Sequence, residues 1–235
     1  MKTVELFGRV GDPENGITDE TFLAQMQGMS PAEDVHVIVN SPGGHVWQGL
    51  NIYQALVARE GMVDIEVRGI AGSIASVVAM AGDRITMHQS SRFMIHNAMG
   101  PSALAFGNAA QLREAADETI KTAELLESIS NDIASIYAAR TQQSTADIRA
   151  MMDAETFLTA SEARSKGFAD DIVANKQLVA CVDAKCHTEP LKTEAELVAV
   201  AEACSGLKVR NRRNTSIELL QRRKRQQRQR EAVLK

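Results

Sequence analysis

The stretch Gly-Ile-Ala-Gly-Ser-Ile-Ala-Ser, residues 69–76, joins a predicted strand to a predicted helix. Before it, residues 63–67 alternate apolar and charged side chains, which is the pattern of a half-buried strand. After it, residues 73–81 are small, apolar and uncharged, which predicts a helix buried on all sides. The turn places the Ser73 hydroxyl at the beginning of a helix, where free backbone amides favour a developing negative charge. The alternative is that Ser73 only caps the helix, as most serines in such positions do.

Strands and helices alternate on both sides of this turn. The expected strands, which are short and apolar, are residues 4–7, 35–39, 85–87, 93–95 and 171–173. The expected helices, which show apolar residues at helical spacing or a capping residue, are 18–27, 46–59, 108–139, 145–152 and a short piece capped by Ser161. Strand–helix alternation repeats three times at the beginning of the chain, which predicts an α/β fold with parallel strands.

The composition fits one large folded domain with an additional segment. The chain has 235 residues, 44% of them hydrophobic, which is enough to bury a core. The longest weakly polar run, residues 69–82, is shorter than the roughly 20 residues that cross a membrane. The N-terminal residues lack the apolar stretch of a signal peptide. We therefore predict a soluble cytoplasmic protein that makes no contact with a membrane.

The C-terminal part differs from the rest in charge. Residues 208–235 hold 11 basic and 2 acidic residues, whereas residues 1–207 hold 15 basic and 28 acidic ones. We predict a globular domain at 1–175 and a partly helical appendage at 176–235 that ends in a flexible basic arm. Such an arm can contact the phosphates of nucleic acid, dock on an acidic protein, or remain disordered.

The cysteines do not indicate a metal or redox site. Cys181, Cys186 and Cys204 are too few for a disulfide framework. Their spacing, with His187 as a further candidate ligand, does not fit a zinc site. We therefore expect neither a metal nor a cofactor.

Two further motifs carry groups that suit catalysis. Ser41-Pro42-Gly43-Gly44 follows the strand at 35–39, and its two glycines let bare backbone approach a ligand closely. The alternative is an ordinary turn. His96 follows the strand at 93–95, where its imidazole can act as a general base or can be a plain surface side chain.

The order and spacing of these motifs resemble those of a known family. Asn40-Ser41-Pro42-Gly43-Gly44, Gly69-x-Ala71-x-Ser73 and Met94-Ile95-His96 precede Phe157-Leu158-Thr159-Ala160-x-Glu162-Ala163-x-x-x-Gly167-x-x-Asp170. Over residues 3–174 the pattern resembles the Clp protease proteolytic subunit (ClpP), and more closely the ClpP-like head-maturation (prohead) proteases of tailed phages and prophages. The resemblance implies a Ser-His-Asp serine endopeptidase on a ClpP/crotonase-like spiral of βαβ units. It also implies heptameric rings and makes 108–139 the handle helix, which interdigitates between two rings.

The resemblance assigns roles to individual residues. Ser73 matches the nucleophile and His96 the general base. Gly44, with Gly43 beside it, and the backbone N–H of Ile74 match the donors of the oxyanion hole, the amides that stabilise the transition-state anion.

The third catalytic residue is where this sequence departs from the family. The family has Asp two residues before the Phe of the Phe-Leu-Thr-Ala segment, and here that position is Glu155. Asp153 lies two residues earlier and is the runner-up, since its shorter side chain matches the family residue. We favour Glu155 because Phe157 fixes the register only two residues away. The alternative is that both carboxylates are merely solvated.

The sequence therefore predicts an ATP-independent serine endopeptidase that cleaves phage scaffold or capsid proteins during head maturation. It would act as a single or double ring, in the host cytoplasm or inside the procapsid, with nucleic acid reached only through the basic arm. Two alternatives stay open. One is a crotonase-type acyl-CoA enzyme on the same fold, and the other is a non-catalytic assembly factor whose triad has decayed.

Overall fold

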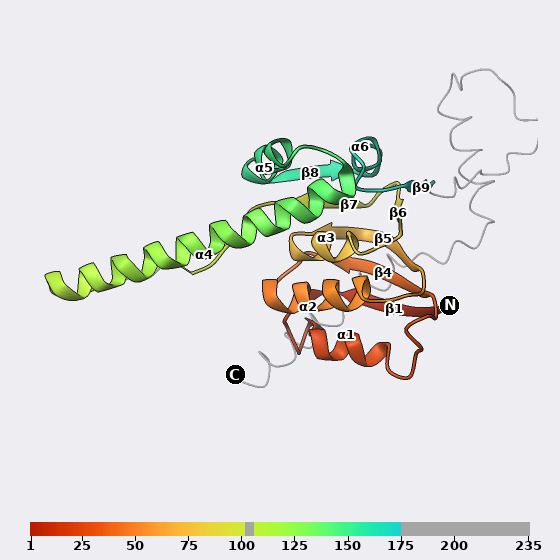
Figure 1. The fold of residues 1–235 in the computed structure, drawn as a ribbon, viewed down its shortest axis with the longest axis horizontal. Helices are drawn as coiled ribbons and strands as arrows, with labels where there is room; N and C mark the ends of the chain where they lie inside the picture. The colour runs from red at the N-terminus through yellow and green to blue at the C-terminus, as the bar shows by residue number, and fades with distance from the viewer. Residues whose placement is uncertain (102–105, 175–235) are drawn as a thin grey trace, which may run out of the picture. The chain divides into compact units, whose positions relative to one another are not determined.

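The structure is a computed structural model that describes residues 1–101 and 106–174, drawn in colour in Figure 1. The chain divides into two units, Met1–Leu178 and Val179–Lys235, and the described residues belong to the first. The predicted appendage, its cysteines and its basic arm lie outside the described residues, so these predictions and the domain boundary at 175 stay untested. No helix of residues 1–101 and 106–174 is long and apolar enough to span a membrane.

The described unit is built on a mostly parallel seven-stranded sheet. Five strands lie side by side in the order β1 (Lys2–Phe7), β4 (Val35–Ser41), β5 (Val63–Gly72), β6 (Arg84–His88) and β9 (Asp171–Val173). Beyond residue 69, β7 (Arg92–Ile95) replaces β6 as the parallel neighbour of β5. β7 also pairs antiparallel with β8 (Thr156–Thr159). Two residues of β2 (Arg9–Val10) pair with two of β3 (Gly16–Ile17) in a separate small sheet.

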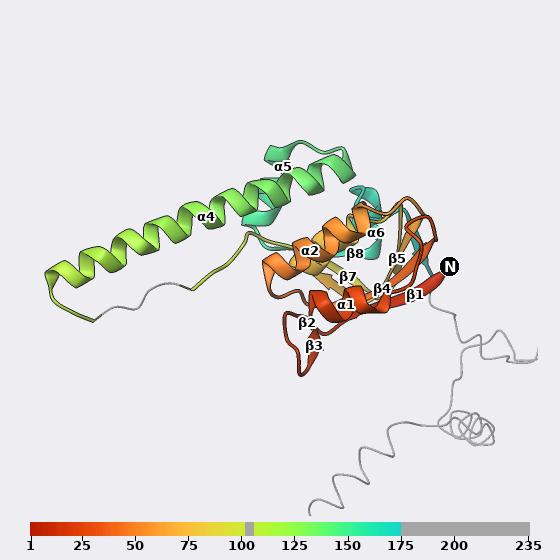
Figure 2. The same ribbon diagram turned by 60° about the horizontal axis from the view of Figure 1, so that its bottom comes forward.

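Helices pack against one face of this sheet, and the long helix projects past the edge of the sheet (Figure 2). They are α1 (Asp19–Gln25), α2 (Val46–Val57), α3 (Ile74–Ala79), α4 (Ala109–Thr141), α5 (Thr145–Asp153) and α6 (Ala160–Ser165). As the sequence predicts, α3 carries no charge, and every residue of it is buried. The predicted mixed α/β class with a mainly parallel sheet and one long helix is confirmed.

The long helix α4 packs against the rest of the unit with its C-terminal half only. Its buried side chains begin at Ile129, and the residues before that point extend away from the sheet (Figures 1 and 2). Leu112 and Ile120 in that extending half are 46% and 57% exposed. A capping box at Asn108 satisfies the first amides of the helix, which explains where it begins.

One local prediction is wrong. The short helix α6 is capped by Thr159, not by Ser161. Thr159 accepts a hydrogen bond from the Glu162 amide, and the Glu162 carboxylate accepts one from the Thr159 amide in return. This reciprocal pair satisfies two free amides at once, which a Ser161 cap without an acid three residues later would not do.

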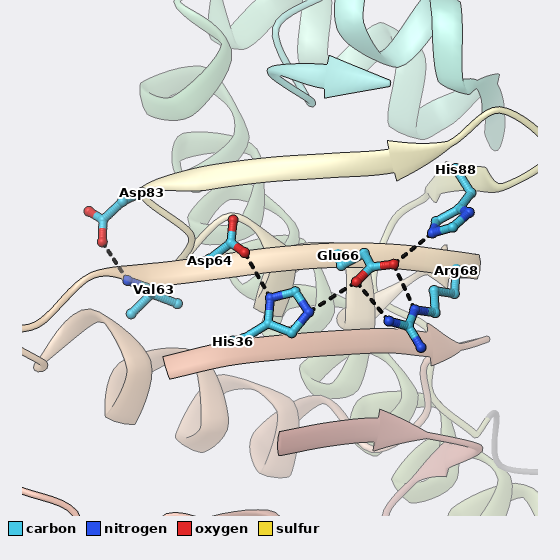
Figure 3. Close-up of polar contacts among 7 residues, drawn as sticks. All are labelled: His36, Val63, Asp64, Glu66, Arg68, Asp83 and His88. Atoms are coloured by element: carbon cyan, nitrogen blue, oxygen red, sulfur yellow. Dashed lines mark hydrogen bonds and ion pairs between the residues drawn. The ribbon is translucent and has the colours of Figure 1, made fainter. Parts of the chain in front are cut away.

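The other face of the sheet carries a network of charged side chains centred on Glu66 (Figure 3). Glu66 accepts two hydrogen bonds from Arg68 at 2.6 and 2.9 Å, one from His88 at 2.6 Å and one from His36 at 3.0 Å. The other ring nitrogen of His36 contacts Asp64 at 2.7 Å. The Arg68 hydrogen bond is the main reason that the pKa of Glu66 falls to about 2, against the opposing effect of partial burial.

Candidate active site

Ser73 lies where β5 ends and α3 begins, in a backbone conformation that non-glycine residues rarely adopt. Its φ is 52° and its ψ is −128°. Such conformations cost about 1–3 kcal/mol and persist only where the surroundings enforce them. Ser73 occupies the N-cap position of α3, yet its side chain makes no capping hydrogen bond. The alternative that Ser73 serves only as a cap is therefore wrong.

The Ser73 hydroxyl instead contacts His96. The distance from Ser73 Oγ to His96 Nε2 is 2.6 Å. The sheet produces this contact: β7 pairs in parallel with the end of β5, and Gly72 stands opposite Met94. The Ser73 amide donates to the Met94 carbonyl at 2.9 Å, which ties the turn to the strand that carries the histidine. Two side chains 23 positions apart in sequence are thus held within hydrogen-bonding distance.

The glycine loop after β4 lies directly against this pair. A Cβ added to Gly43 would lie 2.6 Å from Ser73 Cβ, 2.6 Å from the Gly72 carbonyl and 3.1 Å from the Ile74 amide nitrogen. Gly43 and Gly44 have φ values of 95° and 150°, in the region that favours glycine. Only glycine therefore fits this approach of backbone to the nucleophile.

Hydrogen bonds hold the glycine loop in place and leave two amides free. The Gly43 carbonyl accepts from Val10 at 2.9 Å, and the Gly43 amide donates to Ser41 Oγ at 3.2 Å. Within the described residues, the amides of Gly44 and Ile74 donate to no protein acceptor. Of the three predicted oxyanion-hole residues, Gly44 and Ile74 can therefore donate to a ligand, while the Gly43 amide is already engaged.

The two candidate acids have different surroundings. Asp153 Oδ1 accepts a hydrogen bond from Asn97 Nδ2 at 2.7 Å, and Asn97 Oδ1 accepts one from Arg149 at 3.2 Å. Glu155 is exposed and has a left-handed φ of 46°. Neither carboxylate bonds to the imidazole of His96 within the described part of the chain. The structure thus ties Asp153 to the neighbour of His96 and leaves Glu155 free.

Ser73, His96 and Glu155 line one cavity of about 660 Å³. The glycine loop and the beginning of α2 form part of its wall, and apolar side chains of α4 form another part. Those from α4 are Leu125, Leu126, Ile129 and Ile133. The size and the mostly apolar lining with a few polar groups are typical of ligand sites. Residues 1–101 and 106–174 place no group of three or more His, Cys, Asp or Glu side chains where a metal could bind.

Comparison with known proteins identifies the family. The model of the Clp protease family matches residues 12–176, more than half of the chain. The chain belongs to the Clp protease family. It is 32% identical over 158 residues to the ATP-dependent Clp protease proteolytic subunit of Pleurastrum terricola, covering 66% of this chain and 76% of the relative.

Two bacterial Clp protease subunits give the same picture. The ATP-dependent Clp protease proteolytic subunit of Ligilactobacillus salivarius is 32% identical over 181 residues, covering 76% of this chain and 86% of the relative. That of Bacteroides fragilis is 28% identical over 178 residues, covering 75% and 81%. The family that the motifs indicate is confirmed, and its members are peptidases, typically of the serine type. The narrower likeness to head-maturation proteases stays a prediction.

Two contacts around this site and one wall of its cavity are absent from the sequence-based predictions. The contacts join Ser76 Oγ to Tyr137 OH at 2.6 Å and Asn97 to Asp153, and the wall is the one that α4 contributes. The partners are 61 and 56 positions apart, so no local pattern links them. Only the spacing of Ser76, one helical turn after Ser73, hinted at a contact.

Proposed function

We propose that this chain is a serine endopeptidase with Ser73 as the nucleophile and His96 as the general base. The observation that carries the proposal is the 2.6 Å contact between Ser73 Oγ and His96 Nε2, inside a cavity of a Clp-family fold. A serine hydroxyl is a weak nucleophile unless an adjacent base accepts its proton. The pairing therefore suits acyl transfer better than the proton transfers of an acyl-CoA enzyme.

The chemistry follows from the positions of these groups. Ser73 Oγ attacks the carbonyl carbon of the scissile peptide bond while its proton moves to His96 Nε2. The carbonyl oxygen becomes an anion, and the free amides of Gly44 and Ile74 would stabilise it. When the C–N bond breaks, His96 gives the proton to the leaving amine. Water then attacks the acyl-enzyme with His96 as base, which releases the acid product and restores Ser73.

We assign the third role to Glu155. Two observations support this assignment: Glu155 stands two residues before Phe157, as the family acid does, and it lines the same cavity as His96. Asp153 is less suited because Asn97 already occupies one of its oxygens. Catalytic hydrogen bonds are often long in free enzymes and tighten when substrate binds, so the missing contact to His96 does not exclude Glu155. A carboxylate there would orient the imidazole and stabilise its charged form.

We further propose that the protein works as a heptameric ring or a double ring. The extending half of α4 carries exposed Leu112 and Ile120. Exposed apolar side chains on a projecting helix favour burial against another subunit. In this assembly α4 would be the handle between two rings, and the catalytic sites would face an enclosed chamber. Access would then be limited to flexible or threaded chains.

The substrates that fit the motif pattern are phage scaffold or capsid proteins, cleaved without ATP during head maturation in the host cytoplasm or inside the procapsid. The basic arm would dock the protease on an acidic head protein or contact nucleic acid. This assignment rests on the sequence resemblance alone. A non-catalytic assembly factor would share the rings and the docking but would cleave nothing.

The test is to incubate the 235-residue protein with purified phage scaffold and capsid proteins, without ATP, and to map cleavage by mass spectrometry. Ser73→Ala protein serves as the matched control. We expect discrete cuts in a head protein that are absent with Ser73→Ala. Cleavage of an unfolded model protein but of no head protein would refute the maturation role and keep the peptidase. Intact rings that cleave neither would refute the peptidase.

A further inference from the structure

A buried chain of hydroxyl groups leads from α4 to the backbone of the nucleophile. Tyr137 OH on α4 lies 2.6 Å from Ser76 Oγ on α3. Ser76 Oγ in turn donates to the Ser73 carbonyl at 2.5 Å, and the Ser76 amide donates to the same carbonyl at 2.9 Å. The side chains of Ser76 and Tyr137 are 0% and 1% exposed, so water does not compete for these bonds.

The direction of the bonds follows from the number of protons. A carbonyl oxygen can only accept, so the single hydroxyl proton of Ser76 points to the Ser73 carbonyl. The remaining proton, on Tyr137 OH, must therefore point to Ser76 Oγ. Burial raises the pKa of Tyr137 far above its usual range, which keeps this hydroxyl a neutral donor. The hydrogen bonds thus all donate in one direction, from Tyr137 to Ser76 and from Ser76 to the Ser73 carbonyl.

Aromatic packing holds Tyr137, the first donor of this hydrogen-bond relay, in place. The ring of Tyr137 meets Phe168 edge-on at a centroid distance of 5.7 Å, and Phe168 packs against Phe93 of β7 at 5.5 Å. Phe93 lies three residues before His96 on the same segment. The tyrosine is therefore anchored to the strand that carries the general base as well as to the turn that carries the nucleophile.

We infer that Ser76 and Tyr137 are positioning residues, which hold the strained turn at Ser73 so that its hydroxyl stays aimed at His96. Without the Ser76 hydroxyl, the Ser76 amide alone would hold the Ser73 carbonyl, and the positive φ of Ser73 would relax towards common values, because the strain persists only under such constraints. Rotation of that peptide displaces Ser73 Oγ from His96 Nε2. The inference rests on the proposed peptidase function. It implies that turnover depends on how α4 packs against α3.

The test uses Ser76→Ala, Tyr137→Phe and the double variant, assayed for kcat, KM and the rate of labelling by a fluorophosphonate probe. A displacement of up to 1 Å can cost about 100-fold in rate. We therefore expect a kcat loss of roughly 10- to 100-fold for Ser76→Ala and a smaller loss for Tyr137→Phe, with KM changed less than about twofold. The double variant should be no slower than Ser76→Ala, because Tyr137 acts through Ser76.

Matched controls separate positioning from stability. Ser91 is also 0% exposed, and its amide and hydroxyl donate to the carbonyl three residues earlier, at 2.8 and 2.6 Å, as those of Ser76 do. Ser91→Ala should lower the melting temperature as Ser76→Ala does but keep kcat. The inference would be overturned, and the proposed function kept, by a lower melting temperature with unchanged kcat in Ser76→Ala and Tyr137→Phe. Losses of kcat that multiply in the double variant would have the same consequence. A wild-type protein that the probe does not label would overturn the proposed function as well.

Discussion

Gly43→Ala tests whether the glycine loop must lie against the nucleophile. The added Cβ would lie 2.6 Å from both Ser73 Cβ and the Gly72 carbonyl oxygen. The contact with Gly72 is with backbone, so no flexible side chain can move aside. Either the loop or the turn at Ser73 must shift. Gly44, whose amide we place in the oxyanion hole, would move with the loop.

The size of the shift sets the expected loss. Ordinary contact begins at about 3.4 Å, so the loop and the turn must separate by about 0.8 Å. Misplacement of reacting groups by about 1 Å can cost 100-fold in rate, so kcat should fall by roughly that factor. The φ of 95° adds a cost of about 1–2 kcal/mol to any side chain there, and that lowers stability rather than the rate.

Gly28→Ala is the matched control. Gly28 has a φ of 81°, but an added Cβ would find no atom within 4 Å. It therefore carries the same backbone cost without a clash, worth a few degrees of melting temperature per kcal/mol in a domain of this size. The assay is kcat on one peptide substrate, with melting temperature and ring assembly measured separately. Gly43→Ala with near-normal turnover, or a loss of turnover matched by Gly28→Ala, would refute the reasoning.

Three further predictions address the acid, the charged network and the long helix. Glu155→Gln should keep the fold and lower kcat by orders of magnitude, because an amide cannot stabilise the imidazolium, whereas Asp153→Asn should be mild; a severe Asp153→Asn defect beside a near-normal Glu155→Gln enzyme would reverse the assignment. Since the pKa of Glu66 is lowered, from an ordinary value of 4.5 to about 2, its ion pairs stabilise the fold above about pH 4.5 and lose that effect as pH falls towards 2. Glu66→Gln should therefore lower the free energy of unfolding by about 1–2 kcal/mol at pH 7, a range that allows for solvent screening at the half-exposed Arg68. In urea unfolding near pH 2 the loss should be much smaller, and a loss of free energy that does not change with pH would contradict this. Leu112→Glu with Ile120→Glu should leave the melting temperature of the subunit nearly unchanged, since both side chains are exposed, but should separate double rings into single rings by native mass spectrometry; intact double rings would place the ring contact elsewhere.

The regular elements were predictable because their signals are local. Residues 35–39 and 63–67 form strands as their alternation and β-branched content indicate, and Thr18 caps α1 as its position before two acids suggests. The cap of α6 also has a local signal, since Thr159 and Glu162 have the spacing of a capping box. Ser161 lacks such an acidic partner three positions later, where Arg164 stands, and so makes the weaker cap.

Other features depend on pairing between distant segments. The strand β5 continues through Gly69 to Gly72, although glycine has a low strand propensity, because its last part pairs with β7 and with Ser41 of β4. β8 has only four residues and exists as the antiparallel partner of β7. Small residues and short segments carry no periodicity, so tertiary contact decides their structure.

The site was predictable only in part, because its motifs are local but some of its contacts join distant segments. The glycine loop, Ser73 and His96 stand in motifs whose order indicates the family, and the structure brings them together. The motif register singles out Glu155 as the third catalytic residue, and the structure adds that Glu155 lines the same cavity as Ser73 and His96. The support from Ser76 and Tyr137 could not be foreseen, because it joins two helices that share no sequence signal.

Labelling by a fluorophosphonate tests the central claim most directly, since this probe forms a covalent bond with a serine that a neighbouring base activates. The full-length protein should incorporate one probe per subunit, and peptide mapping should place the label on Ser73. Ser73→Ala should remove the label together with peptide cleavage, and His96→Ala should strongly reduce both. Label on another residue, or full cleavage by Ser73→Ala, would contradict the account.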